Sequence, residues 1–215
     1  MKTLLTVAAL GIISAFSANA EQETRLLRQP TISEDHISFI YGGDVWLADL
    51  KGNNVKRITS TAAVETEPHF SPDGKTLAFS SNRQGQYSVY TVPINGGEPT
   101  RLTWHASDAM VKGWTPDGKS ILFSSTRDTA PKSYHRLWTV PVSGGATSLV
   151  SSQWGFNGAY ADNGKQLIID RMSRWDTEWR NYRGGQNTPL VLLDTQTQEE
   201  VLLPNEKVSI SSLFG

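Results

Sequence analysis

Short stretches in which every second side chain is hydrophobic recur along the 215-residue chain. The clearest three are Leu77 and Phe79, Ile121 and Phe123, and Leu167 and Ile169. Alternation with a period of two is typical of β-strands that bury one face. No stretch shows the three-to-four-residue spacing of an amphipathic helix. The pattern therefore predicts half-buried strands and an all-β fold.

A repeated turn precedes each of these strands. Ser-Pro-Asp-Gly-Lys at 71–75 recurs as Thr-Pro-Asp-Gly-Lys at 115–119 and, more weakly, as Ala-Asp-Asn-Gly-Lys at 161–165. A second signature, Thr-Val-Pro followed by a Gly-Gly pair, fills 91–97 and 139–145. Proline fixes φ near about −65° and glycine accepts a positive φ, so both signatures predict tight turns between antiparallel strands.

The turns belong to a longer repeat. A degenerate first copy occupies 37–49, and a fourth copy ends in the apolar stretches 190–194 and 201–203. Four antiparallel strands in about 44 residues are typical of one β-propeller blade. We therefore predict a partial β-propeller domain over 21–215, with four-stranded antiparallel blades at roughly 24–60, 66–104, 110–150 and 156–203 and the start of a further blade at 204–215.

The number of repeats bears on whether the propeller ring is closed. Propellers of four blades are uncommon, so we expect the chain to hold part of a larger ring, with a closed four-bladed ring as the alternative. An unfinished ring exposes strand edges and an apolar flank, and both favour association. The chain by itself is therefore expected to self-associate.

The first 20 residues have the order of a secretory signal. A positive charge at Lys2 precedes an apolar stretch at 4–16, and Ala-Asn-Ala at 18–20 forms a cleavage site before Glu21. The apolar stretch is shorter than the roughly 20 residues that span a bilayer. We predict a signal peptide at 1–20, cleaved after Ala20, and a periplasmic or secreted mature protein that is not inserted in the membrane.

Composition and charge exclude several classes of function. The chain has 20 Lys and Arg residues against 21 Asp and Glu residues, and its net charge of −1 argues against a nucleic-acid-binding protein. It has no cysteine, which excludes disulfide frameworks, cysteine-ligated metal centres and thiol nucleophiles. With 38% hydrophobic residues and 18 glycines, it is suited to a folded core with many turns.

The motifs of common catalytic and cofactor sites do not occur in the sequence. No Gly-x-Ser-x-Gly pentapeptide marks a nucleophile elbow, and the four histidines are spread singly, without a His-Glu-x-x-His pair. The glycines form turn doublets rather than a phosphate-binding loop. We therefore predict no catalytic, cofactor-binding or metal-binding residue in this chain. Glu65 and Glu67 are interpreted as solvated side chains of a loop.

One connection in the fourth copy is long and rich in aromatic and arginine residues. It spans 172–187, between the second and third strands. In an up-and-down blade such loops emerge on the same end of the ring as the connections between blades, and recognition surfaces are enriched in Trp, Tyr and Arg. We predict a peptide-recognition face made of Trp104, His105, Asp108, Trp154, Trp175, Trp179, Tyr182 and Arg183. Alternatively, Trp175 and Trp179 only pack over the neighbouring blade.

Three features together resemble the N-terminal, TolB-like propeller of the tricorn proteases, in the secreted bacterial branch of the C-terminal processing peptidase clan. They are the Ser-Pro-Asp-Gly-Lys turns, Arg-Leu-Thr-Trp-His at 101–105, and Tyr-Arg-Gly-Gly at 182–185 followed by Thr-Pro at 188–189. The resemblance implies the first two-thirds of a six-bladed propeller in a serine peptidase whose catalytic residues have no counterpart here. It also implies that the propeller gates or docks peptides or unfolded polypeptides.

Two other interpretations stay open from the sequence. The turn motif also occurs in TolB-type propellers, which would make the chain a non-enzymatic binding or scaffold module of the cell envelope. It occurs as well in the propellers of prolyl oligopeptidase-like hydrolases.

Overall fold

The computed structural model describes residues 26–171 and 190–203, which form four four-stranded antiparallel sheets. The first sheet contains β1 (Arg28–Ile32), β2 (His36–Tyr41), β3 (Asp44–Asp49) and β4 (Lys56–Arg57), and the second contains β5 (Glu65–Phe70), β6 (Thr76–Ser81), β7 (Ser88–Pro93) and β8 (Thr100–Arg101). The third contains β9 (Ala109–Trp114), β10 (Ser120–Ser125), β11 (Arg136–Pro141) and β12 (Ser148–Leu149), and the fourth contains β13 (Asn157–Tyr160), β14 (Gln166–Asp170), β15 (Val191–Asp194) and β16 (Glu200–Leu202).

In each sheet the strands pair in chain order, so every blade is a meander. The prediction of an all-β fold built from four-stranded antiparallel blades is confirmed. The predicted signal peptide at 1–20, the stretch 204–215 and the loop residues Trp175, Trp179, Tyr182 and Arg183 lie outside the described residues.

The Pro-Asp-Gly turns form for a local reason. The main-chain N–H of Gly74 donates to the carbonyl of Ser71 at 2.8 Å, and Gly74 has a φ of +68°. Asp73 Oδ1 accepts from the Ser71 hydroxyl at 2.6 Å and from the Lys75 N–H at 3.1 Å. The serine, aspartate and glycine of the motif thus specify the turn by themselves.

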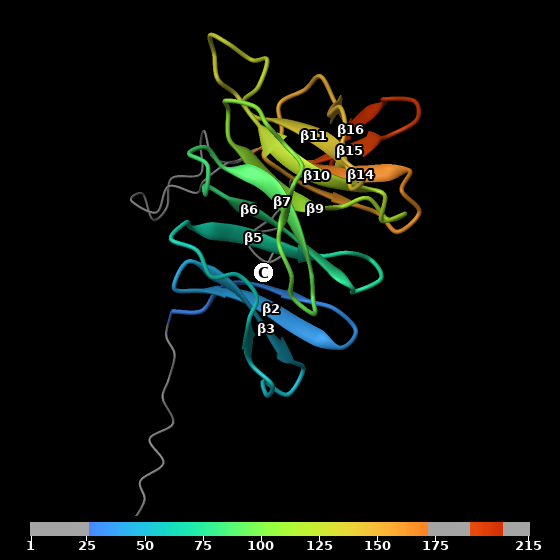
Figure 1. The fold of residues 1–215 in the computed structure, drawn as a ribbon. Coiled ribbons are helices and arrows are strands. Elements are labelled where there is room, and N and C mark those ends of the chain that lie inside the picture. The colour runs from blue at the N-terminus through green and yellow to red at the C-terminus, as the bar shows by residue number, and fades with distance from the viewer. Residues whose placement is uncertain (1–25, 172–189, 204–215) are drawn as a thin grey trace, which may run out of the picture.

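The four sheets stack face to face in chain order (Figure 1), and an apolar cluster fills each of the three interfaces. The interface between the first two sheets contains Leu77 and Phe79, the next Ile121 and Phe123, and the last Leu167 and Ile169. Burying a side chain of this kind contributes about 1.5 to 3 kcal/mol. The apolar faces predicted from the sequence are therefore the surfaces that join neighbouring blades.

The second strands of the two middle blades are buried on both faces, so the prediction of half-buried strands is wrong there. In β6, Leu77 and Phe79 face the first sheet, and all residues from Leu77 to Ser81 are buried. Ser80 faces the third sheet, where its hydroxyl donates to the carbonyl of Ala109 at 3.1 Å and accepts from the N–H of Val111 at 2.8 Å. This second face of β6 consists of the small residues serine and alanine. The alternating pattern of large hydrophobic residues therefore does not show that the face is buried.

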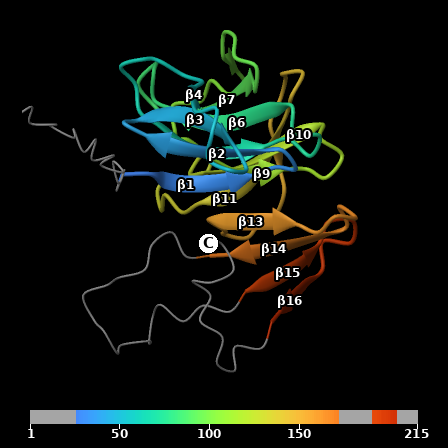
Figure 2. The same ribbon diagram turned by 90° about the horizontal axis from the view of Figure 1, so that it is seen from below.

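The first strand of each sheet is the innermost one. Contacts join β1 to β5, β5 to β9, and β9 to β13. Figure 2 shows β13 as the strand of the fourth sheet that lies nearest to the other sheets, with β16 farthest away. The four innermost strands therefore face a common central space, as in a propeller.

A buried carboxylate links the first two sheets, which corrects the interpretation of Glu65 as a solvated loop residue. Glu65 is 1% exposed because it begins the innermost strand β5 and points between the blades. Its carboxylate accepts hydrogen bonds from the hydroxyl of Thr59 at 2.7 Å and that of Ser81 at 3.0 Å. It also forms an ion pair with Arg83 at 2.9 Å. The hydrogen bonds and the ion pair thus satisfy a polar group whose burial would otherwise cost free energy.

We predict that Glu65→Gln lowers the free energy of unfolding by about 3 to 5 kcal/mol, as expected when one partner of a buried ion pair is removed. The variant leaves the Arg83 guanidinium without its counter-charge. Glu98→Gln, at an exposed position, is the matched control and should not change stability. Urea denaturation measures both, and equal midpoints for the two variants would contradict the role of Glu65.

Candidate functional site

The innermost strands β1 and β5 both contain a bulge, and these bulges help to form the candidate site. The pairing of β1 with β2 shifts between Arg28 and Thr31, and the pairing of β5 with β6 shifts between Thr66 and His69. Within these bulges Gln29 and Glu67 have positive φ angles of 52° and 54°. A bulge turns a side chain away from its regular direction.

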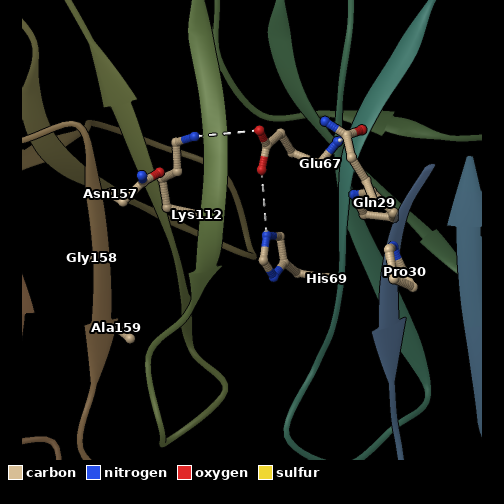
Figure 3. A pocket seen from close by; sticks show the side chains of 9 residues that line it. Gln29, Pro30, Glu67, His69, Lys112, Asn157, Gly158 and Ala159 are labelled. Carbon is tan, nitrogen blue, oxygen red and sulfur yellow. Dashed lines mark hydrogen bonds and ion pairs between the residues drawn. The ribbon is translucent and has the colours of Figure 1, made fainter. Parts of the chain in front are cut away.

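A cavity of about 590 Å³ lies between the innermost strands, and Figure 3 shows its walls. All four sheets contribute to it: Gln29 and Pro30 from β1, Glu67, Pro68 and His69 from β5, Lys112 from β9, and Asn157, Gly158 and Ala159 from β13. It is therefore the central channel of the propeller, and most of the side chains that line it are polar or charged.

Glu67 is the centre of the interactions in this channel. Its carboxylate lies 3.4 Å from Lys112 Nζ and 3.9 Å from His69 Nε2. Its main-chain N–H donates to Gln29 Oε1 at 3.0 Å, which also accepts from the Thr66 hydroxyl at 2.7 Å. Burial acts to raise the pKa of Glu67, but the nearby His69 and Lys112 side chains outweigh it, so the pKa is below its ordinary value.

Lys112 connects the channel to a second group of side chains. Its side chain is 4% exposed, and Nζ lies 4.2 Å from the centre of the Phe156 ring. Burial lowers the pKa of Lys112, and the charge of Glu67 opposes that change. The His135 ring contacts Phe156 edge-on, with 4.8 Å between the ring centres. The pKa of His135 is lowered by burial and by Lys112, against the opposing charge of Asp108.

This set of groups can bind polar ligands. The cavity is lined by a carboxylate, an ammonium group, an imidazole and two amides, with no serine or threonine hydroxyl among the lining residues. Within residues 26–171 and 190–203 no three His, Cys, Asp or Glu side chains are placed to hold a metal ion. The same residues contain no helix that is long and apolar enough to cross a membrane.

Two predicted recognition residues, Trp104 and Trp154, are exposed on consecutive connections between sheets. Trp104 follows β8 and is 67% exposed, and Trp154 follows β12 and is 47% exposed. Each has a guanidinium group near its ring: Arg101 lies 5.7 Å from the Trp104 centroid and Arg171 lies 5.8 Å from that of Trp154. The described part of the predicted face is thus two exposed Trp–Arg pairs.

The other two described residues of the predicted face, His105 and Asp108, stabilise loops. His105 Nδ1 accepts from the N–H of Ser107 at 3.0 Å, and Asp108 Oδ1 accepts from the N–H of Tyr87 at 2.9 Å. The Tyr87 contact ties the loop between β6 and β7 to the connection between β8 and β9. These two kinds of loop therefore emerge at the same end of the sheets, as the sequence predicts.

Sequence reasoning missed the channel residues. Glu67 was interpreted as a solvated loop residue, but its side chain is only 27% exposed and it belongs to β5. The available signal was the spacing of Glu67 and His69, two residues apart and directly before a Pro-Asp-Gly turn. In a strand that spacing places two polar side chains on one face.

One family model matches most of the chain. The model of the tricorn protease N-terminal β-propeller domain matches residues 24–212. Tricorn protease homolog 1 from Streptomyces coelicolor is 35% identical over 163 residues, which cover 74% of this chain and 15% of that protein. The chain therefore spans a small part of its relative's length.

Solved structures show the same fold. The crystal structure of the tricorn protease superposes with a TM-score of 0.69 and 25% identity, over 86% of this chain and 19% of the other. TolB from Acinetobacter baumannii gives a TM-score of 0.64 with 21% identity, over 82% of this chain and 43% of the other, and this likeness concerns the fold alone. Since the family model covers almost the whole chain, this protein belongs to the tricorn protease N-terminal β-propeller family.

Proposed function

We propose that this chain is the propeller part of an exported, periplasmic serine peptidase of the tricorn type, and that its channel docks peptides and gates their passage. The observation that carries this proposal is the polar channel at Glu67 and Lys112, in a chain of the tricorn propeller family. The catalytic residues lie on other parts of the protein. Residues 1–20 serve as the export signal.

The size and chemistry of the channel support peptide docking. A volume of about 590 Å³ falls in the range of about 300 to 1,000 Å³ that is typical of ligand sites. The side chains of Gln29 and Asn157 carry amide groups that match the donors and acceptors of a peptide backbone. Glu67 and Lys112 add one charge of each sign, which suits a chain of mixed side chains rather than a uniformly charged polymer.

The recognition loops and the channel lie toward the same end of the sheets. Asn157 is the first residue of β13 and Glu67 is the third of β5, so both lie near the connections that enter these strands. Those connections include the one that carries Trp154. A peptide that contacts the exposed tryptophans would therefore be next to the polar level of the channel.

A second candidate function is that of a TolB-type binding propeller without an attached peptidase. The superposition on TolB over 82% of this chain favours it, because the same arrangement of blades occurs in a protein that is not named as a protease. The two candidates differ in activity, since only the first requires the intact protein to hydrolyse peptides.

The fold favours the charged form of Glu67, which fixes the sign of a pH effect on stability. The pKa of Glu67 in the folded protein is below its ordinary value of 4.5, so the unfolded chain binds more protons in that range. The resulting stabilisation is fully present above pH 4.5 and is lost as the pH falls through the folded pKa.

We predict that Glu67→Gln makes stability less dependent on pH below about 4.5. Thermal melting between pH 3 and pH 7 measures the effect, and the melting temperature of the variant should fall less than that of the wild type on acidification. Glu34→Gln, at an exposed position, is the control. A variant that parallels the wild type at every pH would contradict the ion pair with Lys112.

We also predict that Lys112→Met in the intact protein lowers kcat/KM for long peptides by about fivefold to tenfold, the usual cost of truncating a strong contact. Short peptides that do not need the channel should be hydrolysed as before. Lys119→Met, whose side chain is 82% exposed on the opposite turns, is the matched control. Equal loss for short and long peptides would contradict gating, and an intact protein without peptidase activity would favour the binding propeller.

For the exposed tryptophans we predict that Trp104→Ala and Trp154→Ala weaken binding of unfolded polypeptide without lowering the melting temperature. Both rings are largely exposed, so their removal leaves no cavity. Fluorescence anisotropy of a labelled, reduced and unfolded protein measures the affinity. Unchanged affinity in the double variant would show that these rings take no part in recognition.

A further inference from the structure

The carboxylate that links the first two sheets is replaced by a methyl group one blade later. Glu65 lies opposite Ser81 in the pairing of β5 with β6, and Ala109 lies opposite Ser125 at the same point of β9 and β10. Ala109 is 1% exposed. The side chain of alanine ends at Cβ, so this position supplies no acceptor between the second and third sheets.

Three of the four groups that donate to this acceptor are nevertheless retained, and the fourth, Thr61, is replaced by His105. Thr103 holds the position of Thr59, since each accepts a main-chain N–H of the third strand of its sheet at 2.9 Å. Ser125 and Arg127 hold the positions of the serine and arginine that bind Glu65. All three are buried, with exposed fractions of 2% for Thr103, 0% for Ser125 and 5% for Arg127.

Arg127 has an unused donor in this interface. Its Nε donates to Ser125 Oγ at 3.3 Å and its Nη1 to Thr147 Oγ1 at 3.1 Å, whereas Nη2 is buried and has no hydrogen-bond partner among the described residues. The guanidinium lies 4.7 Å from the centre of the Phe123 ring and 5.6 Å from that of Trp138. Trp138 Nε1 is also buried and without a partner. An unsatisfied buried donor costs about 1 to 3 kcal/mol, so an acceptor here would be stabilising.

The two interfaces also differ in charge. Between the first and second sheets, two guanidinium groups meet two carboxylates: Arg57 with Asp44 at 2.6 Å and Arg83 with Glu65 at 2.9 Å. Between the second and third sheets, Arg101 and Arg127 donate only to neutral oxygens in the described part of the chain. Burial lowers the pKa of Arg127, against the opposing charge of the exposed Asp128.

We propose that the interface between the second and third sheets binds a small carboxylate anion, held by Arg127, Thr103 and Ser125 in the place that the Glu65 carboxylate takes one blade earlier. A guanidinium and two hydroxyls are three of the four donors that already hold a carboxylate in this protein, the fourth being the Thr61 hydroxyl at 3.2 Å. Because Arg127 is 5% exposed, the anion is a free small molecule rather than the side chain of a docked peptide.

The experiment uses formate as the probe and is carried out on the full chain. Thermal melting in sodium formate is compared with melting in sodium gluconate at equal ionic strength, because gluconate is too bulky for an enclosed site. At ten times its Kd, formate should raise the melting temperature by about 3 to 5 °C. Isothermal titration calorimetry should give one site per chain. Arg127→Met should abolish both responses.

The matched variants are Ala109→Glu and Ala109→Gln, which have the same shape but differ in charge. Ala109→Glu supplies its own carboxylate, so it should melt at a higher temperature and no longer respond to formate. Ala109→Gln should show no such gain. The converse variant, Glu65→Ala, should acquire a second formate-dependent site and regain part of its lost stability in formate.

Three results would overturn the proposal. The first is a wild-type protein that neither melts higher in formate nor binds it by calorimetry, even though Glu65→Ala responds; protein atoms would then fill the third-sheet position. The second is an equal response in wild type and Arg127→Met, which would place the effect elsewhere. The third is a rise with a short glutamate-containing peptide but not with formate, which would assign the site to a docked polypeptide.

Discussion

The stacking of sheets on both sides of the middle blades is the constraint on which the rest of the structure depends. It buries the two faces of β6 and β10, and it also encloses whatever polar side chains lie at the ends of these strands. Polar groups in such a place must be hydrogen-bonded, and charged groups must be paired. The network around Glu65 meets that requirement. Its hydrogen bonds and ion pair stabilise the contact between the first two blades, and they also determine which side chains meet there.

The parts of the fold that the sequence predicts are those that short segments specify locally. The turn around Gly74 forms from hydrogen bonds within five residues, so its recurrence marks three of the four blades. The innermost strands are different, because bulges and stacking decide where their side chains point. Glu67 lies in a bulge and has a positive φ, and its spacing from His69 predicts a shared strand face but not the bulge. The buried Glu65 was missed for a related reason: its partner Arg83 comes from another strand connection.

The candidate site therefore has two layers with different origins. The exposed Trp104 and Trp154 lie on connections between blades, where the chain tolerates large side chains, and their residue types alone make them candidates. The Glu67–Lys112 pair lies on innermost strands, where any polar residue must be accommodated by its neighbours. Connecting loops in general tolerate sequence change more readily than packed strands do, whereas the channel residues are constrained by packing. A function that needs both would combine an adaptable surface with a fixed polar passage.

The three interfaces between blades offer different acceptors to an arginine side chain. Each has an arginine close to an aromatic ring at the loop end of the sheets. In the first interface the acceptor is Glu65, from an innermost strand, and in the third it is Glu200, from the outermost strand, 3.5 Å from Arg171. The middle interface offers Arg127 only neutral oxygens within the described residues. The middle interface thus keeps the serine and arginine donors of the first interface without its acceptor, and this difference is what the proposed anion would make up.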